Sequence, residues 1–167
     1  VREWMEEGYV VHYDSLNAEA EKCRFDSWID VDSSDFTQPG NMSRKIREFC
    51  RKTGQREPQG RAEMYKCILL SLAHKYRETI DELKELTGND FKRIHMVGGG
   101  SRNGLLCRMT SRLTGKEVAA GPYEATVIGN LIAQLISLGE VKDTVEGIEI
   151  IRDSFPLVYY RPEDTDV

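Results

Sequence analysis

The segment Gly98–Asn103, with the sequence GGGSRN, contains the residues best suited to chemistry, and it lies between a short apolar run and a helical pattern. Glycine lets the backbone turn sharply and lets a ligand approach closely, because no Cβ is in the way. The free N–H groups and the dipole at a helix start favour phosphate. A tight turn alone needs only one glycine. The cluster therefore predicts a turn that contacts phosphate, with Gly99 at its centre.

Several phosphate-binding motifs can be compared with this segment. A P-loop is excluded because no G-K-[ST] follows the glycines. The dinucleotide fingerprint fails at its third glycine, where Asn103 stands beside Gly104. That fingerprint also needs an acid at the end of the second strand, whereas Glu117 lies at the beginning of the expected one. A nicotinamide-dinucleotide-binding domain stays an alternative, and a non-enzymatic helical interaction module is a third.

The turn must be positioned by the strands and helices around it. The apolar run at residues 94–97, bounded by charges and glycines, predicts a buried strand. A second strand is expected at 117–120, and this order implies a parallel pair with a right-handed crossover. Two strands are too few for a stable sheet. The expected helices of this half run over 102–114 and 122–138, and a last helix to about 152 begins with Asp143 and Glu146 as a capping box.

Helices dominate the first half of the chain. Residues 1–7 have the character of a helix end stopped by Gly8, which predicts that the chain is part of a longer protein. A short helix capped by Asp14 or Ser15 ends at Lys22, and an ordered loop follows over 25–40. Further helices are expected from a Ser43 cap to Lys52 and, by the apolar periodicity, over 62–86.

Composition narrows the class of protein. The chain has 167 residues, 31% of them charged, and a net charge of −5, which is ordinary for one globular domain and argues against a nucleic-acid surface. No apolar run approaches the roughly 20 residues of a membrane span. The four cysteines form no C-x-x-C pair and, with the three histidines, match no zinc spacing, so no metal site is expected. A reducing, cytoplasmic location is the simplest interpretation.

Three smaller expectations concern packing. Cys50 and Cys67 lie on consecutive helices joined by a turn, and such neighbours can place two thiols face to face without a disulfide. Gly129 is expected to allow close helix packing. Asn130 and Gln134 share one face of an apolar helix, which predicts a buried structural hydrogen-bond pair.

The segment IHMVGGGSRNGLLCRMTSRLTGKEVAAGPYEATVIGNLIAQ resembles the C-terminal ATP-binding segment of the FGGY carbohydrate kinases. The stretches FDSWIDVDSSDFTQPGNM, FCRKTGQ and KCILLSLAHKYR are similar to the same family, so the likeness covers nearly the whole chain. Within the family, VGGGSRN, AGP-EAT-IGN and Gln134 look most like the branch that phosphorylates L-rhamnulose. Only SRLTG is bulkier than the family pattern leads one to expect.

The resemblance implies an incomplete α/β domain of the ribonuclease-H-like, actin-type ATPase fold. It implies phosphoryl transfer from Mg²⁺–ATP to the primary hydroxyl of a ketose, L-rhamnulose or another ketose or polyol, by an aspartate-assisted in-line attack. The sugar-binding N-terminal domain and the catalytic aspartate are expected outside this chain. None of Asp26, Asp30, Asp32 or Asp35 is assigned that role. The residues implied to bind nucleotide are Gly98, Gly99, Gly100, Ser101 and Asn103.

Two further expectations follow from this resemblance. In the actin-type strand order, the strand at 94–97 pairs with a strand that this chain lacks, which leaves an open edge and favours self-association. If Gly99 faces the nucleotide, a side chain there would occupy space that the phosphates or ribose need. A positive φ is also expected at Gly99, and this would disfavour a branched residue.

Overall fold

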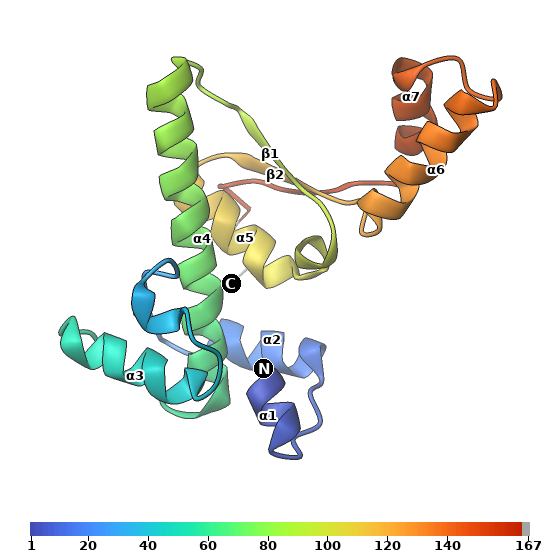
Figure 1. The fold of residues 1–167 in the computed structure, drawn as a ribbon. Helices are drawn as coiled ribbons and strands as arrows, with labels where there is room; N and C mark the ends of the chain where they lie inside the picture. The colour runs from blue at the N-terminus through green and yellow to red at the C-terminus, as the bar shows by residue number, and fades with distance from the viewer. Residues whose placement is uncertain (165–167) are drawn as a thin grey trace. The chain divides into compact units, whose positions relative to one another are not determined.

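The computed structural model describes residues 1–164 and divides the chain into two compact units, Val1–Glu82 and Leu83–Val167. Figure 1 shows the order of the elements along the chain. Within the described residues, no helix is both long enough and apolar enough to span a membrane. The first unit is helical and the second holds a small mixed sheet together with helices, so the described part of the chain is a helix-rich α/β structure.

The first unit contains α1 (Arg2–Glu6), α2 (Tyr13–Lys22), the short 3-10 helix η1 (Ser34–Phe36), α3 (Met42–Lys52) and most of α4 (Gly60–Thr87). The predicted helices are all present. Gly8 follows α1 with φ 86°, as its predicted role at a helix end requires.

Two predicted helix caps in this unit are wrong. Helix α2 begins after His12, and neither Asp14 nor Ser15 is its cap. Helix α3 begins after Asn41, which has a left-handed backbone, rather than at Ser43. The Ser43 amide and hydroxyl instead donate to the Glu3 carboxylate at 3.0 and 2.9 Å. A side chain distant in sequence therefore caps α3, and local propensity could not indicate it.

Side chains from α4 and the preceding turn hold the ordered loop at 25–40. Gln55 bonds both backbone groups of Trp28, accepting from N at 3.0 Å and donating to O at 2.9 Å. The Ser71 hydroxyl accepts from the buried Ile29 amide at 2.9 Å. The Trp28 ring stacks on His74 with centroids 4.3 Å apart. These bonds satisfy buried backbone groups and fix the loop on α4.

The predicted neighbourhood of Cys50 and Cys67 is confirmed. Both thiols are buried and free, and each affects the pKa of the other, which indicates that the two side chains lie close together. Burial raises the pKa of Cys67 to about 12, and the neighbouring Cys50 adds to the effect. The pair is thus a neutral part of the core.

The second unit is built on a three-stranded sheet in the order β1-β2-β3. Strand β1 (Arg93–Met96) pairs in parallel with β2 (Glu117–Ala120), as predicted. Strand β3 (Val158–Tyr160) pairs antiparallel with β2 and was not predicted, because a three-residue strand carries no period of its own. Among the described residues β1 is therefore an edge strand.

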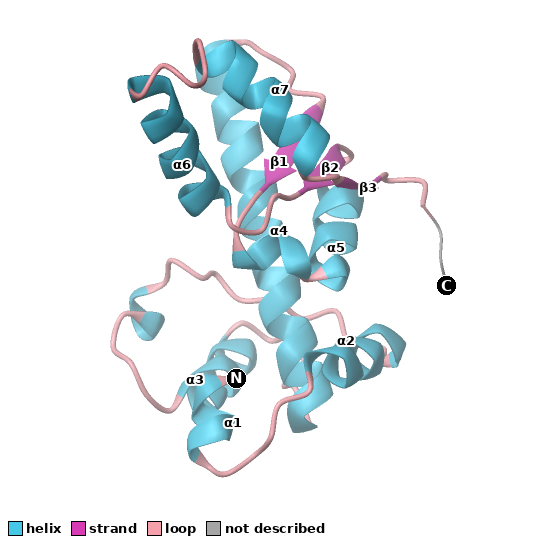
Figure 2. Cartoon of the chain, turned by 90° about the vertical axis from the view of Figure 1, so that its right-hand side faces the viewer, coloured by secondary structure: helices cyan, strands magenta, loops and turns pink. Residues whose placement is uncertain are grey.

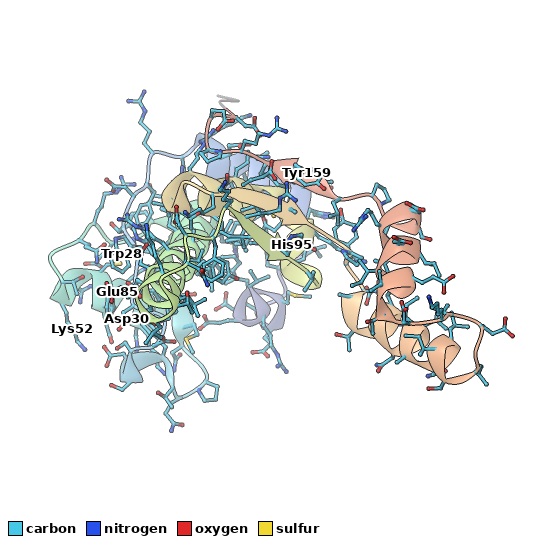
Figure 3. All side chains as sticks on the ribbon, turned by 90° about the horizontal axis from the view of Figure 1, so that it is seen from above. Trp28, Asp30, Lys52, Glu85, His95 and Tyr159 are labelled. Atoms are coloured by element: carbon cyan, nitrogen blue, oxygen red, sulfur yellow. The ribbon has the colours of Figure 1, made fainter. Side chains whose placement is uncertain are left out.

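The predicted burial of the first strand is wrong. Met96 is buried, but Arg93 and His95 are exposed. Helix α5 (Gly104–Thr114) covers only one face of the sheet, and Figure 2 shows it beside the strands. His95 and Tyr159, labelled in Figure 3, both pair in register with Ala119 of the central strand. Alternation along each strand places these residues together on the face opposite Met96.

Helices α6 (Ala125–Ser137) and α7 (Thr144–Ser154) lie side by side in Figure 1. The prediction that Gly129 allows close helix packing is wrong, because a Cβ added there would have nothing within 4 Å. The close approach is instead at Gly147, where an added Cβ would lie 2.5 Å from Ile132 Cγ2. The predicted buried pair of Asn130 and Gln134 is wrong, because both residues are exposed.

The predicted capping box of α7 is present, but one of its two hydrogen bonds differs from the standard pattern. The Asp143 side chain accepts from the Val145 and Glu146 amides at 2.9 and 3.1 Å, as the capping pattern predicts. The Glu146 carboxylate reaches back to the Lys142 amide at 2.6 Å, one residue earlier than a standard capping box.

Candidate functional site

Two loops meet where the parallel strands end. The loop after β1 contains the glycine turn, and the loop after β2 runs through Gly121 and Pro122 to α6. The Gly121 amide donates to Met96 O at 2.9 Å, and the Gly98 amide donates to Pro122 O at 3.3 Å. In open α/β sheets, ligands bind outside the carboxyl ends of the strands. The predicted turn therefore lies where such a fold places a ligand.

The glycines of the turn have two different functions in the backbone. Gly98 has φ 71° and ψ −161°, a conformation open in practice only to glycine. The expectation of a positive φ at Gly99 is wrong, because the chain leaves β1 at Gly98 and Gly99 already belongs to the 3-10 turn η2 (Gly99–Arg102). A Cβ added at Gly99 or Gly100 would meet no atom within 4 Å. The surface over these two residues is therefore open.

The side chains of Ser101 and Asn103 take part in the turn itself. Ser101 is buried, and its hydroxyl donates to Gly98 O at 2.6 Å. Asn103 precedes α5, and its Oδ1 accepts from the Leu106 amide at 3.1 Å. Helix α5 consequently begins at Gly104, two residues later than predicted. These bonds make the turn rigid, which suits a site that must be preorganised.

The thiol beneath the turn is not a nucleophile. Cys107 is fully buried, with its Sγ 3.6 Å from Met96 Sδ and 3.8 Å from Ser101 O. Burial raises the pKa of Cys107 to about 11, so the group is a neutral thiol at physiological pH. Because the thiolate is the reactive form, covalent catalysis by this residue is disfavoured.

Sequence reasoning did not identify the contact between the exposed side chains of Arg102 and Tyr123 beside the turn. The Arg102 guanidinium lies 5.1 Å from the centre of the Tyr123 ring, and its Nη2 lies 3.3 Å from Glu124 Oε1. An aromatic residue three positions after the end of the second parallel strand was the available signal. Only the hydrogen-bonded loops bring the three residues together.

The acid considered for a dinucleotide fingerprint has another role. Glu117 begins β2, and its carboxylate is 2.6 Å from Arg93 Nε and 3.2 Å from Arg161 Nε. Hydrogen bonds from Arg93 and Arg161 lower its pKa. It lies at the opposite end of the strand from the glycine turn, so it cannot take the ribose position of that fingerprint.

The four aspartates near residue 30 lie in the first unit, where Figure 3 labels Asp30. The Asp30 side chain accepts from the Asp32 amide at 3.0 Å. Asp32 pairs with Lys75 at 2.6 Å, and Asp35 with Lys52 at 3.2 Å. Asp26 is exposed. The contacts of Asp30, Asp32 and Asp35 confirm the predicted loop bonding, and no catalytic role is assigned to any of the four.

Comparisons with known proteins show the family of this chain. Residues 2–138 match the family model described as the FGGY family of carbohydrate kinases, C-terminal domain. The chain is 41% identical to a rhamnulokinase of Bacteroides thetaiotaomicron over 153 residues, which is 91% of this chain and 32% of that protein.

Two further similar proteins carry the same name. A rhamnulokinase of Bacillus subtilis is 39% identical over 92% of this chain and 32% of its own length. One of Enterococcus faecalis is 39% identical over 96% of this chain and 33% of its own length. The chain thus spans about a third of the length of the curated relatives it matches.

Proposed function

Because the chain belongs to the FGGY family of carbohydrate kinases, we propose that it forms one side of the ATP site of a sugar kinase, with the ribonuclease-H-like fold of actin-type ATPases. The observation that carries the proposal is the open surface over Gly99 and Gly100, at the carboxyl end of β1 and the N-terminal side of α5. Backbone N–H groups in such a position favour phosphate oxygens.

Each predicted site residue receives a role in this proposal. Gly98 supplies the conformation that turns the chain, and Gly99 and Gly100 leave space for the nucleotide. Ser101 and Asn103 fix the turn and the helix start through their hydrogen bonds. This chain therefore binds and orients Mg²⁺–ATP, and positioning is a large part of phosphoryl-transfer catalysis.

The reaction proposed for the complete enzyme is phosphorylation of L-rhamnulose at its primary hydroxyl, giving L-rhamnulose 1-phosphate. The sugar oxygen bonds to the γ-phosphorus, the bond to the bridging oxygen breaks, and ADP leaves. The hydroxyl proton passes to an aspartate outside this chain. The names of the relatives support this sugar, and another ketose or polyol is the alternative within the family.

The sugar is tested with the complete enzyme and a panel of ketoses and polyols. The highest kcat/KM is expected for L-rhamnulose, with ADP formed in proportion. A higher value for a different sugar would reassign the substrate and leave the kinase assignment in place. The 167-residue chain alone is expected to release no ADP in the presence of any sugar.

The glycine turn is tested by Gly99→Val in the complete enzyme. The added methyl groups would fill the open surface, so KM for ATP should rise while KM for the sugar stays near normal. Gly99→Ala is the graded control, because Gly99 has no positive φ and the smaller side chain should have a smaller effect. A folded Gly99→Val enzyme with unchanged ATP dependence would place the nucleotide elsewhere.

A further inference from the structure

Arg102 and Tyr123 form a flat, exposed pair beside the glycine turn, and the roles proposed above leave this pair unused. The guanidinium carbon lies 5.1 Å from the ring centre. Tyr123 is 43% exposed, and the Arg102 side chain is 61% exposed. A cation–π contact at an exposed site contributes only weakly to stability. The contact therefore orients the two groups but leaves much of their surface to water.

The backbone fixes this pair next to the open glycines. Tyr123 directly follows Pro122, whose carbonyl accepts the Gly98 amide at 3.3 Å. Arg102 is the last residue of the 3-10 turn that contains Gly99 and Gly100. A ligand lying on the turn therefore has a planar aromatic and guanidinium surface within the same pair of loops.

The charge of the pair favours an uncharged ligand group over a phosphate. The Glu124 carboxylate lies 3.3 Å from the Arg102 guanidinium and balances its charge. A guanidinium that binds phosphate presents its N–H groups as a fork. Here the guanidinium instead lies over a ring and beside a carboxylate. A flat, nearly neutral surface suits the π-face of a nucleobase.

We propose that Arg102 and Tyr123 form the stacking platform for the nucleotide base, an inference that rests on the proposed binding of ATP at the glycine turn. Stacking uses the face of the base, so its contribution grows with ring area and is greatest for purines. The platform accordingly favours purine over pyrimidine nucleotides and adds nothing to the binding of phosphates alone.

Calorimetry on the complete enzyme separates the base from the phosphates, with ADP and base-free tripolyphosphate as the two ligands. Tyr123→Ala should raise Kd for ADP roughly 5- to 150-fold, the range of one lost base–aromatic stack. Its Kd for tripolyphosphate should stay unchanged. Tyr123→Phe keeps the ring and should keep the ADP affinity.

Tyr159→Ala is the matched control, because Tyr159 is 46% exposed and also lies under an arginine, Arg93, at 5.4 Å, but on β3. Its ADP affinity should equal that of the unchanged enzyme. Figure 3 shows this tyrosine on the sheet. An equal loss in both alanine variants would mean a general effect on the unit and would overturn the platform.

The remaining outcomes separate the platform from the function on which it rests. If Tyr123→Ala leaves ADP affinity unchanged while Gly99→Val weakens both ligands, the platform is wrong and the nucleotide site stands. If Tyr123→Phe loses as much affinity as Tyr123→Ala, the hydroxyl and not the ring binds, which also overturns stacking. If the unchanged enzyme binds neither ADP nor tripolyphosphate, the proposed function itself fails.

Discussion

The contact between α6 and α7 gives a quantitative test of the structure through Gly147→Ala. The added Cβ would lie 2.5 Å from Ile132 Cγ2, well inside van der Waals contact. Ile132 is almost fully buried, and Cγ2 is attached to its own Cβ in a helix, where branched side chains have one preferred rotamer. The methyl group cannot rotate away at low cost, so the two helices must move apart.

Two terms of opposite sign set the magnitude. Overpacking of a core costs about 1–3 kcal/mol, whereas replacing glycine by alanine inside a helix gains about 1 kcal/mol. The expected net change for Gly147→Ala is thus a loss of about 0–2 kcal/mol. Gly129→Ala on α6 is the matched control, because nothing lies within 4 Å of its added Cβ and the full helix gain remains.

The assay is urea unfolding of the chain, followed by circular dichroism. Gly129→Ala should be more stable than Gly147→Ala by about 1–3 kcal/mol, which is the clash alone. Ile132→Leu removes Cγ2, so in a double-mutant cycle it should recover part of the loss at Gly147. Equal stability of the two alanine variants, with no coupling to Ile132, would refute the close contact between these helices.

Two further predictions concern the sheet edge and the buried thiol. Because Met96 O points toward β2, alternation along the strand turns the His95 N–H toward the open edge. His95→Pro removes this N–H and should reduce the concentration-dependent self-association of the chain in analytical ultracentrifugation. If the chain without this substitution is a monomer at every concentration, edge pairing is contradicted. Burial raises the pKa of Cys67 to about 12, so the stability it gives is present below pH 9 and is lost as pH rises through about 12. The unchanged chain should lose about 1.4 kcal/mol per pH unit in that window relative to Cys67→Ala, and parallel pH profiles of the two proteins would refute this.

The elements with strong local signals could be predicted from the sequence. Glycine stops, the β1–β2 pair and the long α4 each depend on residues close together in the chain. The errors fall where a residue distant in the sequence determines the local structure. Glu3 caps α3 through Ser43, and β3 adds to β2 from nearly forty residues further along the chain. Burial of β1 was predicted from its apolar run, but it depends on which face α5 covers.

The same distinction applies to the site. The glycine turn was predicted because its signal is compositional, although the residue with the special backbone is Gly98 and not Gly99. The pairing of Arg102 with Tyr123 could not be predicted, because it depends on the bond between Gly98 and Pro122 that joins two loops. Hydrogen bonds between loops have no local sequence signature.

The side chains near the turn explain why its proposed role is to position the nucleotide. Ser101 and Asn103 use their polar atoms inside the turn, and the Cys107 thiol is neutral. The Glu124 carboxylate is paired with Arg102, so it is a poor candidate for a general base. What faces outward is glycine backbone and the flat pair of Arg102 and Tyr123. Such a surface can hold a nucleotide in place, and in the proposed reaction the deprotonation of the sugar needs a group outside this turn.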